Sequence, residues 1–502
     1  MISRDCRLFI ACFAGLCFFA ALASGVSASA AATSPDRPNV VFILTDDQRW
    51  DQLGCEAHPF LETPHLDRIA AEGARFANMF VTTSLCSPSR ASYLSGLYAH
   101  RHGVVNNFTD FPHELPSFPR QLQAAGYETA YVGKWHMGED DDSPRPGFDH
   151  WVSHKGQGDY YDTEFNVNGR RRVLKGYYTT RVTDEAIRWL GRQRKQPFLL
   201  ILGHEAPHTP FTPEGKYLHV LDDVKVEYPR SAFSLKDKPD WVRQRLVTWH
   251  GIYGPIFGFR QDFPNTSREG VAEFAAFVRA YTATIKSIDD SAGRIYEALA
   301  QSGQLDNTLL LFAGDNGFFL GEHGMTDKRS MHEPSIRVPL LARYPRLIQP
   351  GTVVEQMVLN TDLAPSVLEI CGAPPLEGIH GRSWKGLLEG DASGWRKAWF
   401  YQYNYEKQFP YTPNVRGVRT DDWKYVHYPH GDGSPDRHMA ELYHLAEDPG
   451  ENHNLIDDPA CAAKLAELKE ELRRQMEATG ALPDKMPIDE GVKTELPDAK
   501  IR

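Results

Sequence analysis

The stretch Val40-Val41-Phe42-Ile43-Leu44 leads directly into Thr45-Asp46-Asp47. Consecutive apolar residues without polar alternation are typical of a strand that is buried on both faces of a sheet. Three later runs have the same form, at residues 129–132, 198–202 and 309–312, and end in the clusters Gly133-Lys134-Trp135-His136, Gly203-His204-Glu205-Ala206-Pro207-His208 and Ala313-Gly314-Asp315-Asn316-Gly317. We therefore expect four buried strands, each followed by polar residues that can carry chemistry.

Helical patterns separate these runs, at residues 66–74, 117–126, 179–192 and 271–303. Strands that alternate with helices form right-handed crossovers and a mostly parallel sheet. Such sheets bind ligands beyond the carboxyl ends of their strands. The sequence therefore predicts an α/β fold with a large, mostly parallel central sheet flanked by helices. It also places Asp, Lys, His and Asn side chains from distant segments along one edge of that sheet.

A smaller unit is expected after residue 392, where the composition changes. Residues 399–403 and 423–428 alternate in the manner of strands, and apolar residues recur at helical spacing over 460–479. These patterns predict a small C-terminal antiparallel sheet closed by a helix. The expected division is an N-terminal domain at 37–392, a C-terminal subdomain at 393–480 and a loosely held polar tail at 481–502.

Residues 209–270 have the composition of a long insertion, rich in proline and containing Trp241 and Trp249. A long excursion at the carboxyl edge of a sheet usually shapes a substrate site. A plain surface lobe is an equally good interpretation.

The N-terminus has the pattern of a targeting segment. Arg4 and Arg7 precede an apolar run over residues 8–26, and the small residues Ser27-Ala28-Ser29-Ala30 follow. This order predicts a secretory signal peptide at residues 1–30 and export to the periplasm or the medium, with an uncleaved membrane anchor as the alternative. No other window is long and apolar enough to span a bilayer, so no integral membrane segment is expected after signal removal.

Charge and cysteine content narrow the class further. The chain has 55 Lys and Arg against 66 Asp and Glu, a net charge of −11, and so lacks the overall basic field of a nucleic-acid-binding protein. Beyond residue 30 the cysteines are Cys55, Cys86, Cys371 and Cys461. If Cys86 has a special role, the other three permit at most one disulfide. We therefore expect a large hydrophobic core to stabilise the fold.

The most informative segment for chemistry is Cys86-Ser87-Pro88-Ser89-Arg90. Pro88 suits the first turn of a helix, which puts Cys86 at the helix N-terminus. The helix dipole stabilises developing negative charge there, and Arg90 lies one turn further on the same face. From the residues alone, this is either a reactive thiol beside an anion-binding arginine or a buried structural cysteine.

The same segment resembles the recognition motif of formylglycine-dependent (type I) sulfatases, which belong to the alkaline-phosphatase-like superfamily. The resemblance covers about residues 37 to 460, and the other matching clusters are Asp46-Asp47, Gly133-Lys134-Trp135-His136-Met137-Gly138, Pro207-His208, Gly314-Asp315-Asn316-Gly317, Asp327-Lys328 and Glu441-Leu442-Tyr443-His444-Leu445. It implies an alkaline-phosphatase-like fold and oxidation of Cys86 to formylglycine (3-oxoalanine) by a formylglycine-generating enzyme. The hydrated aldehyde would supply a hydroxyl nucleophile for the sulfur of a sulfate ester.

Four of the clustered residues, Asp46, Asp47, Asp315 and Asn316, offer only oxygen ligands to a metal. Hard oxygen donors without His or thiolate select Ca²⁺ or Mg²⁺ over zinc. The resemblance implies one divalent cation, usually Ca²⁺, held by these residues together with residue 86.

The remaining clusters match the other needs of sulfate-ester cleavage. Lys134 and Lys328 carry point charges suited to sulfate oxygens, and Arg90 would hold the formylglycine hydroxyl and offset the carboxylates. His136 is the candidate base for regenerating the aldehyde, because imidazole titrates near neutral pH. His208 is the candidate acid for the leaving oxygen and a substrate contact, with His204 as the alternative.

The resemblance implies a sulfuric ester hydrolase that acts on a sulfated carbohydrate or another small sulfate ester. Residues 326–345 and 411–428 are similar to exported bacterial glycan sulfatases, including N-acetylglucosamine-6-sulfate enzymes, which makes a glycosaminoglycan substrate an expectation. Two alternatives stay open at this point. One is hydrolysis of phosphonate monoesters or phosphodiesters at the same site, and the other is an inactive protein that binds sulfated glycans.

Overall fold

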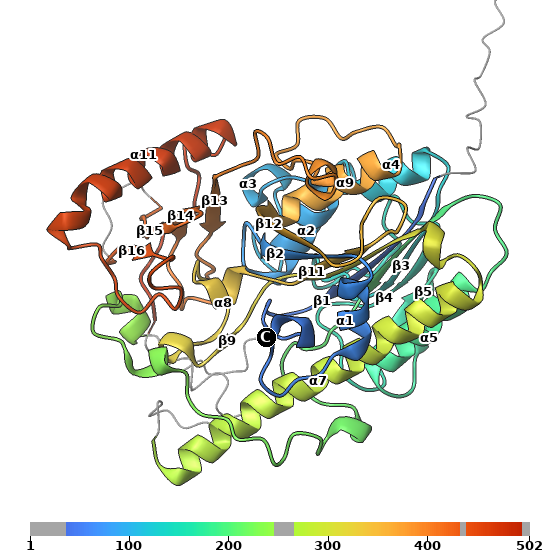
Figure 1. Ribbon diagram of the computed structural model, residues 1–502, viewed down its shortest axis with the longest axis horizontal. Coiled ribbons are helices and arrows are strands. Elements are labelled where there is room, and N and C mark those ends of the chain that lie inside the picture. The colour runs from blue at the N-terminus through green and yellow to red at the C-terminus, as the bar shows by residue number, and fades with distance from the viewer. Residues whose placement is uncertain (1–36, 245–265, 432–437, 494–502) are drawn as a thin grey trace, which may run out of the picture. The chain divides into compact units, whose positions relative to one another are not determined.

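A ten-stranded sheet forms the centre of the fold (Figure 1). From edge to edge its strands are β12 (Thr352–Leu359), β2 (Ala74–Phe80), β11 (Leu340–Arg343), β8 (Thr308–Gly314), β1 (Asn39–Thr45), β7 (Phe198–Gly203), β3 (Glu128–Gly133), β4 (His150–Ser153), β5 (Glu164–Val167) and β6 (Arg170–Val173). The computed structural model describes residues 37–244, 266–431 and 438–493, and the predicted signal peptide lies outside them. Within these ranges only β5 and β11 run against the other strands of this sheet, which confirms the mostly parallel sheet.

Helices cover both faces of the sheet. One face carries α1 (Pro64–Ala71), α5 (Tyr178–Leu190) and α7 (Arg268–Gln301), and the other carries α2 (Cys86–Ser95), α4 (Phe118–Ala124) and α9 (Leu363–Ile370). On β1, Val41 and Ile43 enter the first core and Val40 and Phe42 enter the second. Because successive side chains of a strand point to opposite faces, a strand between two helical layers needs an uninterrupted apolar run.

The four runs identified in the sequence are β8, β1, β7 and β3, which are consecutive neighbours in the sheet. Thr45 at the end of β1 pairs with Gly314 of β8, and Gly203 of β7 pairs with both Leu44 and Gly133. The polar clusters that follow the four strands therefore meet at one edge. Gly133 turns the chain there with a φ of +110°, and a Cβ atom at this position would lie 1.9 Å from the Gly203 carbonyl oxygen.

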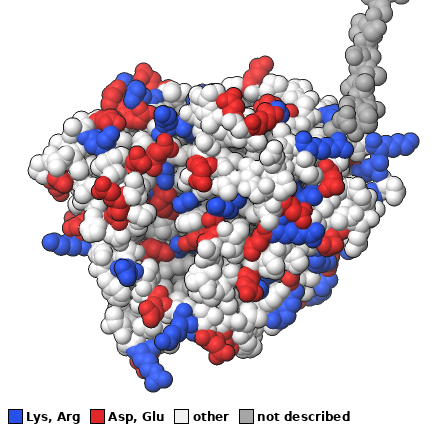
Figure 2. Space-filling view, in the orientation of Figure 1, with Lys and Arg blue, Asp and Glu red and all other residues white. Residues whose placement is uncertain are grey.

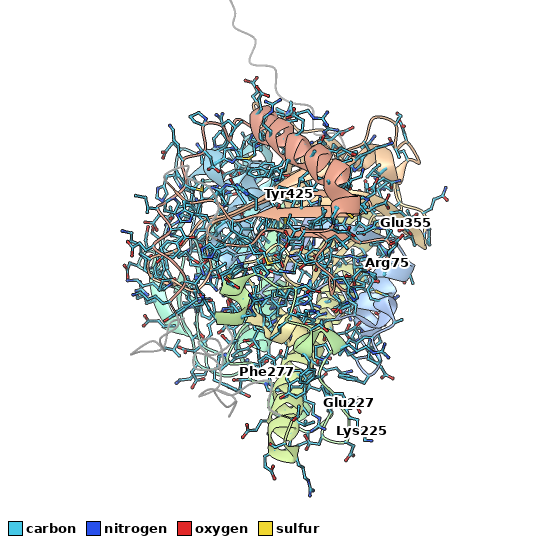
Figure 3. The ribbon with its side chains drawn as sticks, turned by 90° about the vertical axis from the view of Figure 1, so that its left-hand side faces the viewer. Arg75, Lys225, Glu227, Phe277, Glu355 and Tyr425 are labelled. Carbon is cyan, nitrogen blue, oxygen red and sulfur yellow. The ribbon has the colours of Figure 1, made fainter. Side chains whose placement is uncertain are left out.

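A second sheet follows in the chain, as predicted. Its order is β13 (Ala398–Tyr403), β14 (Val415–Thr420), β15 (Trp423–His427) and β16 (Glu441–His444), with all neighbours antiparallel. Helix α11 (Ala462–Ala478) covers one face of it, and Tyr425 lies beneath this helix with Leu468 and Leu472 (Figure 3). Shorter elements complete the described chain: α3 (Ala99–His102), β9 (Phe319–Leu320), β10 (Thr326–Asp327), α8 (Glu333–Ile336) and α10 (Lys385–Leu388).

The described part of the C-terminal tail, residues 481–493, is not loosely held as expected. Asp484 forms an ion pair of 2.7 Å with Arg416 of β14, and the Asn414 side chain donates a hydrogen bond of 2.8 Å to the Pro487 carbonyl. Arg416 is almost fully buried, so the sheet needs this carboxylate from the tail to balance a buried charge. A polar composition alone did not reveal that dependence.

The described part of the insertion packs against the C-terminal sheet. Trp241 is fully buried and its ring lies 5.5 Å from that of Tyr428, and Lys238 donates a hydrogen bond of 2.6 Å to the Tyr443 hydroxyl. Trp249 lies outside the described residues, so a role of the insertion at the substrate stays a prediction.

Disulfides contribute nothing to the described part of the fold. Cys55, Cys86, Cys371 and Cys461 are all free thiols, within the sequence expectation of at most one bridge. No helix among the described residues is both long and apolar enough to cross a membrane.

Candidate active site

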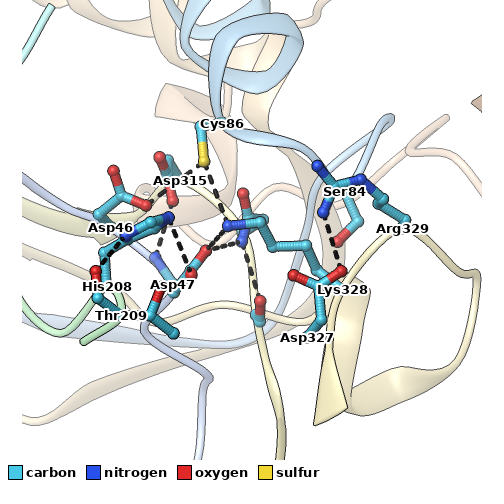
Figure 4. A network of polar contacts seen from close by, with 12 residues as sticks. Asp46, Asp47, Ser84, Cys86, His208, Thr209, Asp315, Asp327, Lys328 and Arg329 are labelled. Carbon is cyan, nitrogen blue, oxygen red and sulfur yellow. Dashed lines mark hydrogen bonds and ion pairs between the residues drawn. The ribbon is translucent and has the colours of Figure 1, made fainter. Parts of the chain in front are cut away.

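Helix α2 begins at Cys86, as the position of Pro88 predicted, and every residue of this helix is buried. Cys86 Sγ donates a hydrogen bond of 3.4 Å to Asp46 Oδ1 and accepts one of 3.3 Å from Lys328 Nζ (Figure 4). Burial raises the pKa of the Cys86 thiol well above its usual range, and the Asp46 charge raises it further. The unmodified residue is therefore a neutral thiol, and a neutral thiol is a weak nucleophile.

Three carboxylates converge beside this thiol. Asp46 and Asp47 follow β1, Asp315 follows β8, and an oxygen of each lies within 4.8 Å of the others. The Asp47 backbone N–H donates to Asp315 Oδ1 at 3.0 Å, which ties the two loops together. Asp47 also has a φ of +62°, a conformation that is costly outside glycine and that concentrates at functional sites.

Arg90 bridges two of these carboxylates from the buried face of α2. Its Nε donates to Asp315 Oδ2 at 2.8 Å, its Nη2 to Asp46 Oδ2 at 3.1 Å and its Nη1 to the Lys134 carbonyl at 2.7 Å. The helix places Arg90 one turn from Cys86, so the spacing in the motif brings thiol and guanidinium to the same cluster. Removing this side chain would leave the buried Asp315 carboxylate without its ion pair and Asp46 with Lys134 alone, which is destabilising.

Two lysines complete the charge balance. Lys134 forms an ion pair with Asp46, and Lys328 forms one with Asp47. Burial acts to raise the pKa of Asp46, but Lys134 and the other nearby bases outweigh it and hold that pKa well below its usual range. Burial raises the pKa of Asp47 to about 7 despite Lys328, because Asp46 and Asp315 repel a further negative charge. The three carboxylates thus face three cations, Arg90, Lys134 and Lys328, and Asp47 is the carboxylate that these cations stabilise least.

The donor set fits a hard divalent cation. Asp47 Oδ2 and Asn316 Oδ1 are buried and have no hydrogen-bond partner among the described residues. The Asn316 amide nitrogen donates to Asp47 Oδ1 at 2.7 Å, which fixes the side chain's orientation. Unpaired buried oxygens are costly, and Ca²⁺ or Mg²⁺ accepts ligands of this kind. The residues predicted from the sequence therefore supply the buried oxygen atoms that such an ion needs.

The two neighbouring histidines after β7 point to different surroundings. His208 Nε2 lies 3.8 Å from Asp47 Oδ2, and its Nδ1 lies 2.8 Å from the Thr209 carbonyl. His204 Nε2 instead bonds the Ser291 hydroxyl of α7 at 3.1 Å, and burial lowers the pKa of His204 to about 3. The structure therefore places His208 beside the acidic cluster. His204 instead makes a hydrogen bond to α7.

His136 lies on the turn that follows β3 and has a φ of +46°. Its Nε2 lies 3.1 Å from Glu139 Oε1, and its Nδ1 is buried without a described partner. Burial lowers the pKa of His136 well below its usual range, and the positive charge of Lys134 lowers it further. The ring is therefore neutral, and it has a free nitrogen that can accept a proton when Nε2 donates to Glu139.

Two residues that touch the site were missed in the sequence. Glu139 contacts His136, and Gln157 accepts a hydrogen bond from Lys134 Nζ. Glu139 follows His136 by three residues, a spacing that could have suggested a contact across a turn. Gln157 lies between two glycines in an irregular segment, and nothing in its surroundings gave a signal.

The loop that carries Lys328 is braced on both sides. Asp327 and Arg329 have φ values of +79° and +77° and form an ion pair of 2.8 Å with each other. The Arg329 backbone N–H donates to the Ser84 carbonyl at 3.2 Å, which connects this loop to the segment just before Cys86 (Figure 4). These contacts hold the loop in place, and they therefore fix the position of Lys328 next to Cys86 and Asp47.

Comparison with known families gives two matches. The model of the sulfatase family matches residues 38–373. A second model, described as N-sulphoglucosamine sulphohydrolase, C-terminal, matches residues 321–478. Together the two matches span both sheets.

Individual relatives agree with these families. An N-acetylglucosamine-6-O-sulfatase of Bacteroides thetaiotaomicron is 32% identical, over 88% of this chain and 87% of that protein. A solved structure of a protein in complex with its substrate D-glucosamine-2-N,6-O-disulfate superposes with a TM-score of 0.81 and 31% identity, over 89% of this chain and 99% of the other. A phosphonate monoester hydrolase from Silicibacter pomeroyi shares the fold, with a TM-score of 0.73 and 23% identity over 88% of this chain and 96% of the other.

Proposed function

Since this chain belongs to the sulfatase family and is a sulfuric ester hydrolase, we propose that it removes sulfate from an amino sugar of the glycosaminoglycan type, such as N-acetylglucosamine-6-sulfate. The names of its relatives support this substrate, because one is an N-acetylglucosamine-6-O-sulfatase and another was solved with a sulfated glucosamine. The observation that carries the proposal is the single buried cluster of Cys86, three carboxylates, Arg90 and two lysines. The phosphonate monoester hydrolase, at 23% identity, shares the fold alone.

We assign the metal to the oxygen donors of Asp46, Asp47, Asp315 and Asn316, and Ca²⁺ is the ion that we expect. A bound cation of this kind stabilises negative charge on an ester oxygen as a Lewis acid. Arg90 keeps Asp46 and Asp315 in place from the protein side through its two ion pairs. The ligand geometry therefore depends on α2 as much as on the strand ends.

We further propose that Cys86 is converted to formylglycine by a formylglycine-generating enzyme, which the family implies. Formylglycine supplies a hydroxyl nucleophile and a means of releasing sulfate that neither Ser nor Cys possesses. The neutral, deeply buried thiol of the unmodified residue supports this assignment, because that thiol is poorly suited to attack an anionic ester.

Lys134 and Lys328 provide fixed positive charge for the sulfate oxygens. Both ammonium groups lie in the cluster before substrate arrives, held by Asp46 and Asp47 respectively. Charge that is already in position costs no reorganisation during the reaction, and such preorganised charge is usually the largest contribution to catalysis.

Proton transfer is divided between two histidines. His136 is neutral and presents a free Nδ1, so it can take the proton when sulfate is released. His208 faces the cluster through Nε2, so we assign it to protonate the leaving oxygen of the sugar. His204, which bonds Ser291, is then a structural neighbour.

We place the enzyme outside the cytoplasm, on the basis of the signal-peptide pattern at residues 1–30. The hydrolysis of sulfated glycans by an exported enzyme is consistent with this location. The division into a domain at 37–392 and a subdomain at 393–480 is likewise our proposal.

The test is a comparison of kcat/KM on N-acetylglucosamine-6-sulfate, other sulfated sugars, a phenyl phosphonate monoester and an aryl sulfate. The enzyme must carry confirmed formylglycine. We expect a 6-sulfated amino sugar to give the highest value, because contacts with the sugar lower the barrier in addition to contacts with the sulfate. A phosphonate that exceeds every sulfate ester would overturn the reaction class, and an aryl sulfate that exceeds every sugar would overturn the substrate class.

A further inference from the structure

Lys328 lies between two residues with a strained backbone. Asp327 and Arg329 both have a positive φ, and neither is a glycine. Such residues keep this conformation only where the surrounding structure holds them, because the chain relaxes when it is released. The turn 327–329 therefore needs contacts from outside to keep the Lys328 ammonium in the catalytic cluster.

The loop 404–414, between β13 and β14, supplies such contacts through Arg329. Glu406 accepts a hydrogen bond of 2.9 Å from Arg329 Nε, and the Arg329 guanidinium carbon lies 3.9 Å from the centroid of the Phe409 ring. The Tyr403 hydroxyl donates to the same Glu406 oxygen at 2.6 Å, which fixes the carboxylate. Arg329 and Glu406 are both buried, so water does not weaken their attraction. The loop thus holds the strained turn beside the catalytic cluster (Figure 4).

The loop 404–414 is itself held from outside. It joins two regular strands but forms one isolated bridge and no helix of its own. Residues 484–493, which we call the strap, contact it. Arg416 connects the two segments, because it donates to Asn404 Oδ1 at 2.9 Å and to both carboxylate oxygens of Asp484 at 2.7 and 2.9 Å. The start of the loop is therefore tied to the start of the strap.

Two further contacts hold the rest of the loop. The Asn414 side chain donates to the Pro487 carbonyl at 2.8 Å and accepts a hydrogen bond of 2.9 Å from the Tyr405 N–H. The Lys493 N–H donates to the Pro410 carbonyl at 2.8 Å. Asn414 is fully buried, so loss of its partner would leave a polar group unpaired away from water. The strap therefore contacts the loop at both ends and in the middle.

Specific contacts hold the strap, and a broad electrostatic field does not. Figure 2 shows Asp and Glu side chains intermixed with Lys and Arg over the part of the molecule that Figure 1 labels β13–β16 and α11. Charges of mixed sign form no patch that would attract a peptide segment from a distance. The strap also lies beyond residue 478, where the second family match ends. Membership of the family therefore does not explain it.

We propose that the strap positions Lys328 for catalysis, because it braces the loop 404–414 and, through that loop, Arg329. Its residues are positioning residues, since they act through the loop. This inference rests on the proposed role of Lys328 in binding the sulfate oxygens. Loss of the strap frees the loop, lets the turn 327–329 relax and moves the Lys328 ammonium. A displacement of about 1 Å at such a group costs up to about 10²-fold in rate.

The test shortens the chain after residue 486. This change removes the contacts of Pro487 and Lys493 but keeps the ion pair of Asp484 with Arg416, so the buried guanidinium stays balanced. With formylglycine confirmed, we expect kcat on an aryl sulfate to fall about tenfold to a hundredfold, while unfolding stays cooperative. A synthetic peptide of the removed residues should restore turnover, and a scrambled peptide of the same composition should not. A shortened enzyme that keeps full kcat would overturn the proposal.

A double-mutant cycle tests whether the strap acts through Lys328. In a Lys328→Ala background, shortening the chain should cause no additional loss of kcat, because the side chain that the strap positions is already absent. A purely structural role of the strap would lower kcat equally in both backgrounds. That result would also overturn the proposal.

Point variants decide the matter if the shortened chain does not fold. Lys493→Pro removes the N–H that bonds the Pro410 carbonyl, and it should lower kcat about threefold to tenfold, the equivalent of one hydrogen bond. Lys493→Arg keeps this N–H and the charge, and it should keep kcat. Lys407→Ser breaks only an exposed ion pair of 3.4 Å with Glu490 of the strap and should have no effect. Equal kcat values for Lys493→Pro and Lys493→Arg would contradict the bracing.

Hydrogen exchange separates this inference from the proposed function, because it requires no turnover. In the shortened enzyme, amide exchange should become faster in residues 327–329 and 404–414 and stay unchanged in β1. If the full chain hydrolyses no sulfate ester although exchange at 327–329 responds in this way, the proposed function fails and the bracing of the turn stands. Unchanged exchange at 327–329 would refute the bracing itself.

Discussion

His136 and His208 are held in place by different groups of the candidate site. His136 is oriented by Glu139 and has a free nitrogen, whereas His208 is oriented by the Thr209 carbonyl and faces Asp47. A ring whose orientation is fixed through one nitrogen presents the other in a defined direction. The two histidines can therefore divide the roles of base and acid without exchanging them.

The variant His208→Ala tests the assignment of the leaving-group acid. It should lower kcat on a 6-sulfated sugar by roughly 10²–10⁴-fold. The loss on an aryl sulfate should be far smaller, because a phenolate leaves without protonation. Steady-state kinetics on both substrates gives the ratio, and His204→Ala is the matched control. An equal loss on the two substrates in His208→Ala would contradict the role.

At the scale of elements, buried charges attach the C-terminal sheet to the segment that follows the active site. Lys424 of β15 contacts Glu333 at 2.7 Å and Glu451 at 2.6 Å. Glu441 of β16 lies 3.1 Å from His332 Nε2 and accepts a hydrogen bond of 2.6 Å from Tyr443. Glu333 and His332 closely follow Lys328, so the position of that lysine depends on the second sheet.

This attachment makes stability depend on pH through Glu441. Burial acts to raise the pKa of Glu441, but His332 and Lys238 outweigh it and lower the pKa to about 2. A depressed pKa stabilises the folded state above the unfolded value of about 4.3, by about 3 kcal/mol here, and this stability disappears as pH falls toward 2. In urea unfolding, Glu441→Gln should have a lower free energy of unfolding than the unaltered protein at pH 7. The difference between the two proteins should be smaller at pH 3. A difference in the free energy of unfolding that is the same at pH 7 and pH 3 would show that the charge of Glu441 does not cause it.

Only some of the strands can be recognised from the sequence alone. β8, β1, β7 and β3 are buried on both faces and are therefore continuous apolar runs. β6 contains Arg170-Arg171-Arg172 and is exposed along its whole length, so its sequence resembles a loop and only pairing with β5 makes it a strand. β11 is short and runs against β8 and β2. Such strands are determined by partners that are distant in sequence, and local patterns do not contain that information.

At the scale of the whole molecule, the sequence likewise predicts only some of the contacts in the candidate site. Asp46, Asp315 and Lys134 could be predicted to meet, because each follows a strand of the same parallel sheet. The contact of Gln157 with Lys134 could not, because an irregular segment places Gln157. The ion pair of Asp484 with Arg416 was hidden for the same reason.

A single metal ion should stabilise the whole fold, because it binds the folded state and the strand ends separate on unfolding. At 100 times its Kd such an ion contributes about 2.7 kcal/mol. Chelation should therefore lower Tm, and Ca²⁺ should restore it. Asp315→Ala should not respond to either treatment in a thermal melt. Full metal occupancy in an Asp46→Ala/Asp315→Ala double variant would contradict the ligand assignment.

The central claim is that residue 86 carries the catalytic group in modified form, and one measurement tests it most directly. The mass of the peptide that contains residue 86 and the turnover of a 6-sulfated amino sugar are determined on the same preparations, which differ in the extent of conversion. Formylglycine makes that peptide about 18 Da lighter, because the thiol carbon becomes an aldehyde. We predict that turnover rises in proportion to the lighter fraction and vanishes when every molecule retains the Cys86 thiol. Sustained turnover by a preparation whose peptide has only the unmodified mass would contradict the account.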